Sequence, residues 1–269
     1  PDQYQVDELS VRGEAWKECD FSGYDVVLHV AGIAHVSTDP SMESQYYKVN
    51  RDLAIEVANK AKQEKVKQFI FTSSIIVYGD SSPINKKRVI DKDTIPQPTN
   101  FYGNSKLQAE ISIQKLESDD FRIVVIRPPM VYGYGCKGNY LKLSKVARRL
   151  PLFPDIENQR SMIYINNLCE FLRLMIDNQE KGLFFPQNSE YVKTSEIVSR
   201  IAETYGKKIR LVKGMNGAIK MIFGKTKIFK KVFGSLIYDQ NMSEYFLDYQ
   251  VKNLRESIME SEKENGRME

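Results

Sequence analysis

The sequence predicts an α/β protein built on a doubly wound parallel sheet, and two observations lead to this fold class. Short apolar runs alternate with longer helical patterns through the first half of the chain, which is the signature of consecutive strand–helix–strand units. The strand candidates are nearly continuous in Val, Ile and Phe, as expected for parallel strands covered on both faces. The 269 residues, 42% hydrophobic and 28% charged, suffice for a sizeable core and exclude collagen-like and wholly disordered chains.

Three strands and two helices are expected, in alternating order, in the first half. The strands lie at the apolar runs Tyr24–Val30, Gln68–Ser73 and Phe121–Arg127. The first helix is expected at about 43–64, where apolar residues recur on one face. The second is expected at about 101–116, after a start signal that contains Pro and Asn. Elements in this order predict parallel strands joined by helical crossovers.

The pattern changes after residue 135, so two domains are expected. Residues 1–135 form the sheet domain, and residues 136–269 form a smaller, mostly helical lobe from which some elements return to the main sheet. Helical patterns in the second part lie at about 139–149, 166–178, 194–205 and 245–262, with a strand candidate at Leu183–Phe185.

Composition and charge exclude several classes of protein. No apolar run reaches the length of about 18–20 residues that a membrane-spanning helix needs, and the first residues do not resemble a secretory signal. Three scattered cysteines and two histidines predict neither a disulfide framework nor a metal site, so a reduced, cytoplasmic protein is expected. A net charge of +4 is too small to indicate nucleic-acid binding.

One segment is strongly basic. Residues 207–231 contain nine Lys or Arg residues and no Asp or Glu. The segment either contacts a membrane surface or another polyanion, or is a solvated helix face near an anionic substrate. The second interpretation is favoured because Gly214, Gly217 and Gly224 interrupt any amphipathic helix.

The motif with the clearest chemistry is Tyr102-Gly-Asn-Ser-Lys106 on the second predicted helix. A spacing of four places the phenol and the ammonium on one face, where the ammonium is expected to lower the pKa of the phenol. Thr72-Ser73-Ser74 lies upstream, at the carboxyl end of a predicted strand, where ligands of open α/β sheets bind. A hydroxyl and an acid–base pair are therefore expected to meet there.

Together these motifs resemble the extended short-chain dehydrogenase/reductase superfamily, in particular its NAD-dependent nucleotide-sugar epimerases and dehydratases. Further stretches agree with that family in order and spacing: Asp25–Gly32, Lys48–Asn50, Arg127–Gly133 and Arg160–Leu168. The resemblance covers essentially the whole chain. It implies a Rossmann-like NAD-binding domain followed by a substrate-binding lobe.

The resemblance also implies the roles of individual residues. Tyr102 would be the general base, Lys106 would tune its pKa and contact a ribose, and Ser74 would bind the reacting oxygen. The other residues that the family match places around the dinucleotide are Ala31, Gly32, Asn50, Ser73 and Pro128. Arg160, with Asn139, would bind the nucleoside diphosphate of the substrate.

The residues after Ser74 narrow the reaction. Dehydratases of this family carry an Asp–Glu pair where this chain has Ile75 and Ile76, neither of which can move a proton. The resemblance therefore favours NAD-dependent 4-epimerisation of a UDP-hexose or UDP-N-acetylhexosamine, as in UDP-glucose 4-epimerase, for bacterial surface polysaccharide synthesis. The alternatives are a reductase or dehydrogenase of the same superfamily, or a catalytically silent binding remnant. A homodimer through the helices at about 43–64 and 101–117 is also expected.

The chain departs from the family at its start. The family opens with a strand and a GxxGxxG turn whose helix binds the pyrophosphate, but only Gly13 and Gly23 precede the first strong strand here. The motif Gly133–Gly138 fits GxGxxG and is assigned to the loop that leads to the substrate lobe. Residues 4–9 resemble the family's third strand, so about two strands are expected to be missing. A fragment of a complete enzyme is favoured over a short homologue that has lost cofactor binding.

Overall fold

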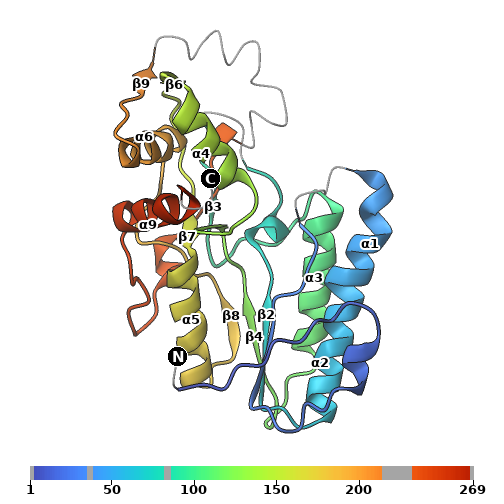
Figure 1. Cartoon of the computed structure of the whole chain (residues 1–269). Helices are drawn as coiled ribbons and strands as arrows, with labels where there is room; N and C mark the ends of the chain where they lie inside the picture. Colours follow the sequence, from blue (N-terminus) through green and yellow to red (C-terminus); the bar gives the residue numbers. More distant parts are fainter. Residues whose placement is uncertain (1–2, 35–38, 82–85, 214–231, 267–269) are drawn as a thin grey trace.

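A four-stranded parallel sheet forms the centre of the protein. The computed structural model describes residues 3–34, 39–81, 86–213 and 232–266 (Figure 1). The strands β1 (Val26–His29), β2 (Gln68–Thr72), β4 (Arg122–Ile126) and β8 (Gly182–Phe184) follow the order β1-β2-β4-β8, and every pair is parallel. The expected strands and the return of one strand from the second half are confirmed.

One face of the sheet is covered by the helices of the first half. A continuous helical segment runs through α1 (Glu43–Tyr47), a π-helical turn (Lys48–Asp52) and α2 (Leu53–Gln63), and α3 (Phe101–Gln114) packs beside it. Small side chains on these helices allow close contact with the strands. The buried residues shared between helices and sheet include Ala54, Val57, Ala58, Ala61, Phe69, Phe71, Ala109, Ile113, Ile123 and Val125.

The opposite face is covered by α5 (Ile165–Asp177), so the sheet is doubly wound as expected (Figure 1). Apolar residues of α5 pack on the alternate side chains of β2 and β4. The cluster includes Ile70, Val124, Ile126, Phe171, Leu174 and Met175. The side-chain amide of Gln68 donates to the carbonyl oxygens of Met175 and Glu180, at 2.9 Å each, and fixes the end of α5 against the start of β2.

The remaining elements of the second half form a lobe beyond one end of the sheet (Figure 1). The lobe contains α4 (Asn139–Arg149), α6 (Thr194–Thr204) and α9 (Leu254–Gly266), which surround one apolar cluster. Its short parallel strand pairs are β5 (Met130–Tyr132) with β7 (Met162–Tyr164) and β6 (Leu152–Pro154) with β9 (Arg210–Val212). A third parallel pair, β3 (Val89–Ile90) with β10 (Ile237–Tyr238), joins this lobe to the sheet domain. The division at residue 135 and the mostly helical character of the lobe stay predictions.

Single turns of helix complete the description. They lie at Ala15–Glu18, Pro40–Met42, Ile75–Tyr78 and Gln240–Ser243. None of the helices in the described ranges combines the length and apolar character that crossing a bilayer requires. Most of the basic segment expected to contact a membrane or polyanion, residues 214–231, lies outside the described residues.

The helix expected at 245–262 is shorter than predicted. It begins at Leu254, because Asn253 and Glu256 form a reciprocal capping box: the Asn253 side chain accepts from the Glu256 amide at 3.0 Å, and the Glu256 carboxylate accepts from the Asn253 amide at 3.2 Å. Tyr245 and Tyr249, whose spacing of four suggested a helix, instead pack in irregular backbone around Phe171.

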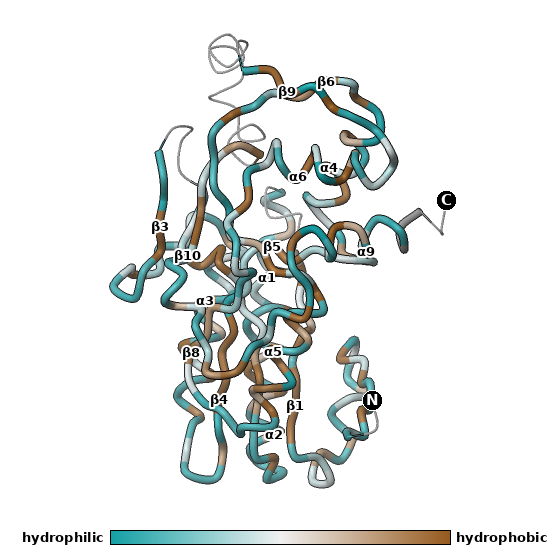
Figure 2. Tube along the Cα trace, turned by 90° about the vertical axis from the view of Figure 1, so that its left-hand side faces the viewer, coloured by the Kyte–Doolittle hydropathy of each residue, from teal (hydrophilic) through white to brown (hydrophobic). Residues whose placement is uncertain are grey.

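The strand expected at residues 4–9 is absent from the described structure, where this segment is irregular. In Figure 2 the segment lies apart from β1, whose hydrophobic residues are brown. A strand needs a neighbour to satisfy its backbone groups, and residues 4–9 do not reach the edge of the sheet.

Candidate functional site

Tyr102 is placed by the first turn of α3. The side chain of Asn100 caps this turn by accepting from the amide of Gly103 at 3.0 Å. Gly103 allows the turn to approach its neighbours closely, since a Cβ there would lie 2.7 Å from the carbonyl oxygen of Ile76 and 2.9 Å from Cβ of Pro98. The start of α3 is thereby packed directly on the turn that follows Ser74.

Ser74 lies at the end of β2, where the backbone turns into Ile75–Tyr78. Its hydroxyl accepts from the amide of Ile76 at 3.3 Å, and the carbonyl of Pro128 accepts from the amide of Ile75 at 3.0 Å. The side chains of Ser74 and Tyr102 are hydrogen bonded to each other. The expected meeting of the strand-end hydroxyl and the helix phenol is therefore present.

The pKa of Tyr102 differs from the expectation. Burial raises the pKa above its ordinary value, the hydrogen bond from Ser74 opposes this, and Tyr46, whose ring lies edge-on at 5.8 Å, raises it further. The prediction that Lys106 lowers this pKa is wrong for this structure, because the Lys106 ammonium is directed elsewhere. Nζ donates to the carbonyl of Thr72 at 2.8 Å and lies 4.7 Å from the centre of the Phe71 ring.

Lys106 is buried, and burial lowers its pKa to about 8, while the charge of Glu110 acts in the opposite direction. The backbone at Gly32 lies against this ammonium. A Cβ on Gly32 would be 3.3 Å from Nζ of Lys106 and 3.1 Å from Oδ1 of Asn50. Glycine at this position leaves room for the lysine to reach the sheet edge.

Asn50 holds the loop after β1. Its side chain accepts from the amide of Ile33 at 2.7 Å and donates to the carbonyl of the same residue at 3.0 Å. It also donates to the hydroxyl of Ser105 at 3.3 Å, which ties the loop to α3. Asn50 is fully buried and lies in the π-helical turn. Ala31 and Gly32 directly precede the loop residue that it holds.

Two buried charged residues were not singled out from the sequence as site residues. Glu110 pairs with Arg127, and the Ser73 hydroxyl donates to Glu110. Ser73 was expected to line the dinucleotide, but its side chain faces this ion pair. A charged residue one turn after Lys106, on a helix face that is otherwise buried, was the available signal.

The two residues expected to bind a diphosphate lie in the second part of the chain. Asn139 is the first residue of α4. Arg160 is directed toward the sheet domain: its guanidinium donates to the carbonyl of Val232 at 3.2 Å and to the hydroxyl of Ser81 at 3.4 Å. Burial lowers the pKa of Arg160 to about 10. Arg160 thus reaches the segment that follows the Ser74 turn.

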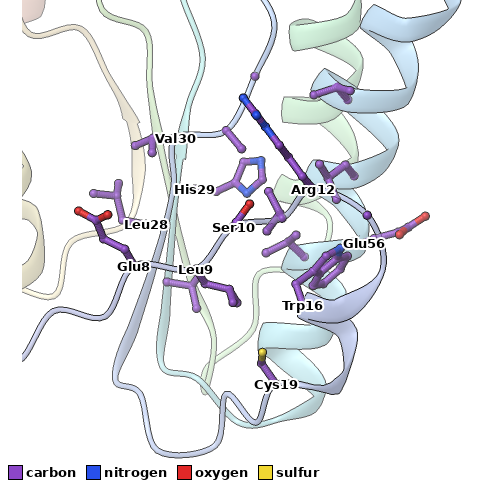
Figure 3. A pocket seen from close by; sticks show the side chains of 18 of the residues that line it. Glu8, Leu9, Ser10, Arg12, Trp16, Cys19, Leu28, His29, Val30 and Glu56 are labelled. Atoms are coloured by element: carbon purple, nitrogen blue, oxygen red, sulfur yellow. The ribbon is translucent and has the colours of Figure 1, made fainter. Parts of the chain in front are cut away.

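The fit to a dinucleotide is one-sided. Lys106, Gly32, Ser74 and Tyr102 converge at the carboxyl ends of β1 and β2, as needed at the end where redox chemistry occurs. A diphosphate needs backbone amides at a glycine-rich helix start. In the described part of the chain, the edge beyond β1 is occupied by a cavity of about 1060 Å³, without such a turn (Figure 3).

Comparisons with known proteins agree with this site. Residues 8–185 match the model of the NAD dependent epimerase/dehydratase family. The UDP-glucose 4-epimerase of Vibrio cholerae is 31% identical over 225 residues, which are 80% of this chain and 68% of that protein. The N-acetyl-alpha-D-glucosaminyl-diphospho-ditrans,octacis-undecaprenol 4-epimerase of Escherichia coli O157:H7 is 28% identical over 74% of this chain and 60% of its own length. The chain thus spans roughly two thirds of these relatives.

A solved structure supports the same fold. The UDP-glucuronic acid 4-epimerase of Bacillus cereus, in complex with UDP-glucuronic acid and NAD, superimposes with a TM-score of 0.72 over 94% of this chain and 80% of its own, at 20% identity. The family is NAD-dependent by its description, so the expected cofactor class is confirmed at the level of the family. On sequence and fold together, this chain belongs to the NAD-dependent epimerase/dehydratase family.

Proposed function

We propose that the site performs 4-epimerisation of a UDP-hexose or UDP-N-acetylhexosamine. The observation that carries the proposal is the hydrogen-bonded pair of Ser74 and Tyr102, placed beside Lys106 at the end of β2. Two of the curated relatives are named as 4-epimerases, which supports C4 as the reacting carbon.

The residues of the chain would handle the proton of the C4 hydroxyl. Ser74 binds the C4 oxygen, and Tyr102 removes its proton when hydrogen leaves C4 as hydride. NAD, when bound, would accept this hydride and return it to the other face of the resulting 4-keto sugar. The raised pKa of Tyr102 means that its anionic form needs positive charge nearby, and Lys106, one helical turn away, is the residue that can supply it.

The neighbours of Ser74 support epimerisation rather than elimination. Ile75 and Ile76 occupy the turn after Ser74, and Ile75 packs in the apolar cluster with Val77 and Tyr238. Neither side chain can protonate a leaving hydroxyl. A reaction that needs one acid–base group and a hydride carrier is therefore favoured over a dehydration that needs a second acid–base pair.

The substrate would lie between the sheet domain and the second lobe. Arg160 offers a guanidinium suited to paired phosphate oxygens, and Asn139 begins the adjacent helix of that lobe. The Escherichia coli relative is named for an undecaprenol-linked sugar, so a lipid-linked diphospho-sugar is a second candidate substrate. Both substrates suit a role in bacterial surface polysaccharide synthesis, in which we place this protein.

The test is conversion of UDP-galactose and UDP-N-acetylgalactosamine to their C4 epimers by protein with NAD bound. Tyr102→Phe should lower turnover about 100- to 10,000-fold while leaving the circular dichroism spectrum unchanged. Tyr24→Phe, an exposed tyrosine, is the matched control. Equal turnover of Tyr102→Phe and wild type, or no conversion by a chain shown to hold NAD, would overturn the proposal.

The same assay separates the alternatives. A reductase or dehydrogenase would change nicotinamide absorbance stoichiometrically with substrate, whereas an epimerase only borrows the hydride. A binding remnant would bind UDP-sugar through Arg160 and convert none.

A further inference from the structure

The edge of the central sheet at β1 has no neighbouring strand among the described residues. The strand order is β1-β2-β4-β8, so the backbone groups on the outer side of Val26–His29 are unpaired within the sheet. Fully parallel sheets are nearly always covered on both faces, and their edges are protected. An open edge on such a sheet therefore requires an explanation.

A large cavity lies along this edge (Figure 3). Its volume of about 1060 Å³ is at or above the range of about 300–1,000 Å³ usual for small-ligand pockets. The residues around it come from the N-terminal segment (7–14), from β1 and the loop that follows (26–33), and from the start of α2. The cavity thus runs beside the strand rather than only beyond its end.

The apolar face under α5 continues past the cover that α5 provides. Leu28 is in register with Ile70, which is fully buried, yet Leu28 is 40% exposed and Val30 is 67% exposed. Figure 3 shows Leu28 and Val30 on one side of β1 and His29 on the other. Two apolar side chains are thereby left open on the face that a helix covers elsewhere.

His29 gives a second, independent sign. It is 4% exposed, its ring stacks at 6.0 Å from Phe69 and 6.1 Å from Phe71, and Nε2 has no hydrogen-bond partner in the described part of the structure. A buried imidazole nitrogen without a partner costs free energy. Since His29 also lines the cavity, a polar group placed there would satisfy it.

The chemistry of the site shows what is missing. The residues for proton transfer converge at the ends of β1 and β2, but the described residues offer no glycine-rich helix start for a diphosphate at this edge. The missing backbone amides and the open edge are at the same place, beside Ala31 and Gly32. One additional element could correct both.

We propose that the cavity beside β1 is the docking site of a polypeptide segment outside residues 1–269, made of a parallel β-strand, a glycine-rich turn and a helix. The strand pairs with Val26–Val30, the helix covers Leu28 and Val30 next to α5, and the backbone of the segment provides a partner for Nε2 of His29. The turn brings the amides that bind the cofactor diphosphate. This inference rests on the proposed function for the identity of the bound cofactor, but not for the docking itself.

A second copy of the chain fits this edge less well. Its own residues 7–14 would lie beside its own β1, so two such edges would bring these segments into conflict. A single parallel strand with a crossover helix matches both the all-parallel sheet and the exposed apolar face.

The test uses a synthetic segment of about 25 residues, the summed length of an average strand, a turn and a helix. Trp16 is the only tryptophan, is buried and lines the cavity, so its fluorescence reports docking. We expect a saturable change in Trp16 emission and, by equilibrium dialysis, about one NAD per chain only when the segment is present. A scrambled peptide is the control, and the segment fused to the chain through a flexible linker removes any limit of affinity.

Variants on the edge give the second readout. Leu28→Lys or Val30→Lys should weaken docking about tenfold or more, because the ammonium would be buried against an apolar helix. Ile95→Lys, at an apolar residue that is 73% exposed and away from the cavity, should have no effect.

Three results would overturn the proposal: one NAD per chain without the segment, no Trp16 change and no NAD binding even with the fused segment, or a dimer that Val30→Lys dissociates. If the segment docks and NAD binds but no sugar is epimerised, the docking site stands and the proposed function fails.

Discussion

Glu110 and Arg127 form a buried ion pair that joins the helix carrying Tyr102 and Lys106 to the end of β4. Nε of Arg127 lies 3.0 Å from Oε2 of Glu110, and the two side chains are 1% and 7% exposed. The guanidinium also donates to the hydroxyl of Tyr78 at 2.7 Å, and the Ser73 hydroxyl donates to Glu110. This network fixes the position of the catalytic helix relative to both strand ends.

Breaking this pair should destabilise the protein strongly. Arg127→Met leaves the Glu110 carboxylate buried without its cation, so we expect the free energy of unfolding to fall by about 3–5 kcal/mol in urea titrations. The double variant Glu110→Gln, Arg127→Met should lose less, since no charge is left unpaired. Lys67→Ala, which breaks an exposed pair with Asp25, should cost about 1 kcal/mol or less. Equal losses for Arg127→Met and Lys67→Ala would contradict this account.

Gly103→Ala should loosen the contact that places Tyr102. The added Cβ would meet the Ile76 carbonyl and Pro98, so a loss of about 1–3 kcal/mol in unfolding free energy is expected, together with lower turnover. Gly23→Ala is the matched control, because a Cβ there meets no atom within 4 Å. Thermal and urea unfolding of both variants measure the difference. A Gly103→Ala protein as stable and active as Gly23→Ala would show that the close approach is unimportant.

His29 should make the protein sensitive to acid. Burial lowers its pKa to about 3 from an ordinary 6.5, with the charge of Lys106 adding to the effect. Between these values the unfolded chain binds a proton that the folded protein does not. Stability from this group is therefore complete above about pH 6.5 and falls by a few kcal/mol as the pH drops toward 3. His29→Gln should lose less stability between pH 7 and 4.5, as followed by urea unfolding. An unchanged acid slope would argue against a buried neutral imidazole.

Lys106 should act at the alkaline end. Its pKa is lowered to about 8 from 10.5, so the unfolded state binds more protons between these values and stability rises with pH across this window. Below about pH 8 the lysine is protonated in both states, and the full cost of burying the charge remains. Lys106→Met should abolish the rise between pH 8 and 10.5, whereas Lys67→Met, at an exposed lysine, should retain it. Parallel slopes for wild type and Lys106→Met would disprove the assignment.

The sequence by itself determined the elements and the family motifs. Strand and helix positions follow from the local recurrence of apolar residues, and the one-turn spacing of Tyr102 and Lys106 follows from helix geometry. The proximity of Ser74 and Tyr102 was also predictable, because parallel strands bring their carboxyl ends to one edge. The exception in local structure was 245–253, where the Asn253–Glu256 capping signal went unused.

Only the tertiary structure decided the electrostatics and the open edge. The pKa of Tyr102 is raised because burial outweighs its hydrogen bond with Ser74, and burial is a property of the packed molecule. The Glu110–Arg127 pair joins separate elements across the interior, so no local pattern marks it. The cavity beside β1 likewise becomes visible only when the strands are placed in order. Spacing along the chain fixes which side chains share a helix face, whereas depth from solvent and contacts between elements arise only on folding.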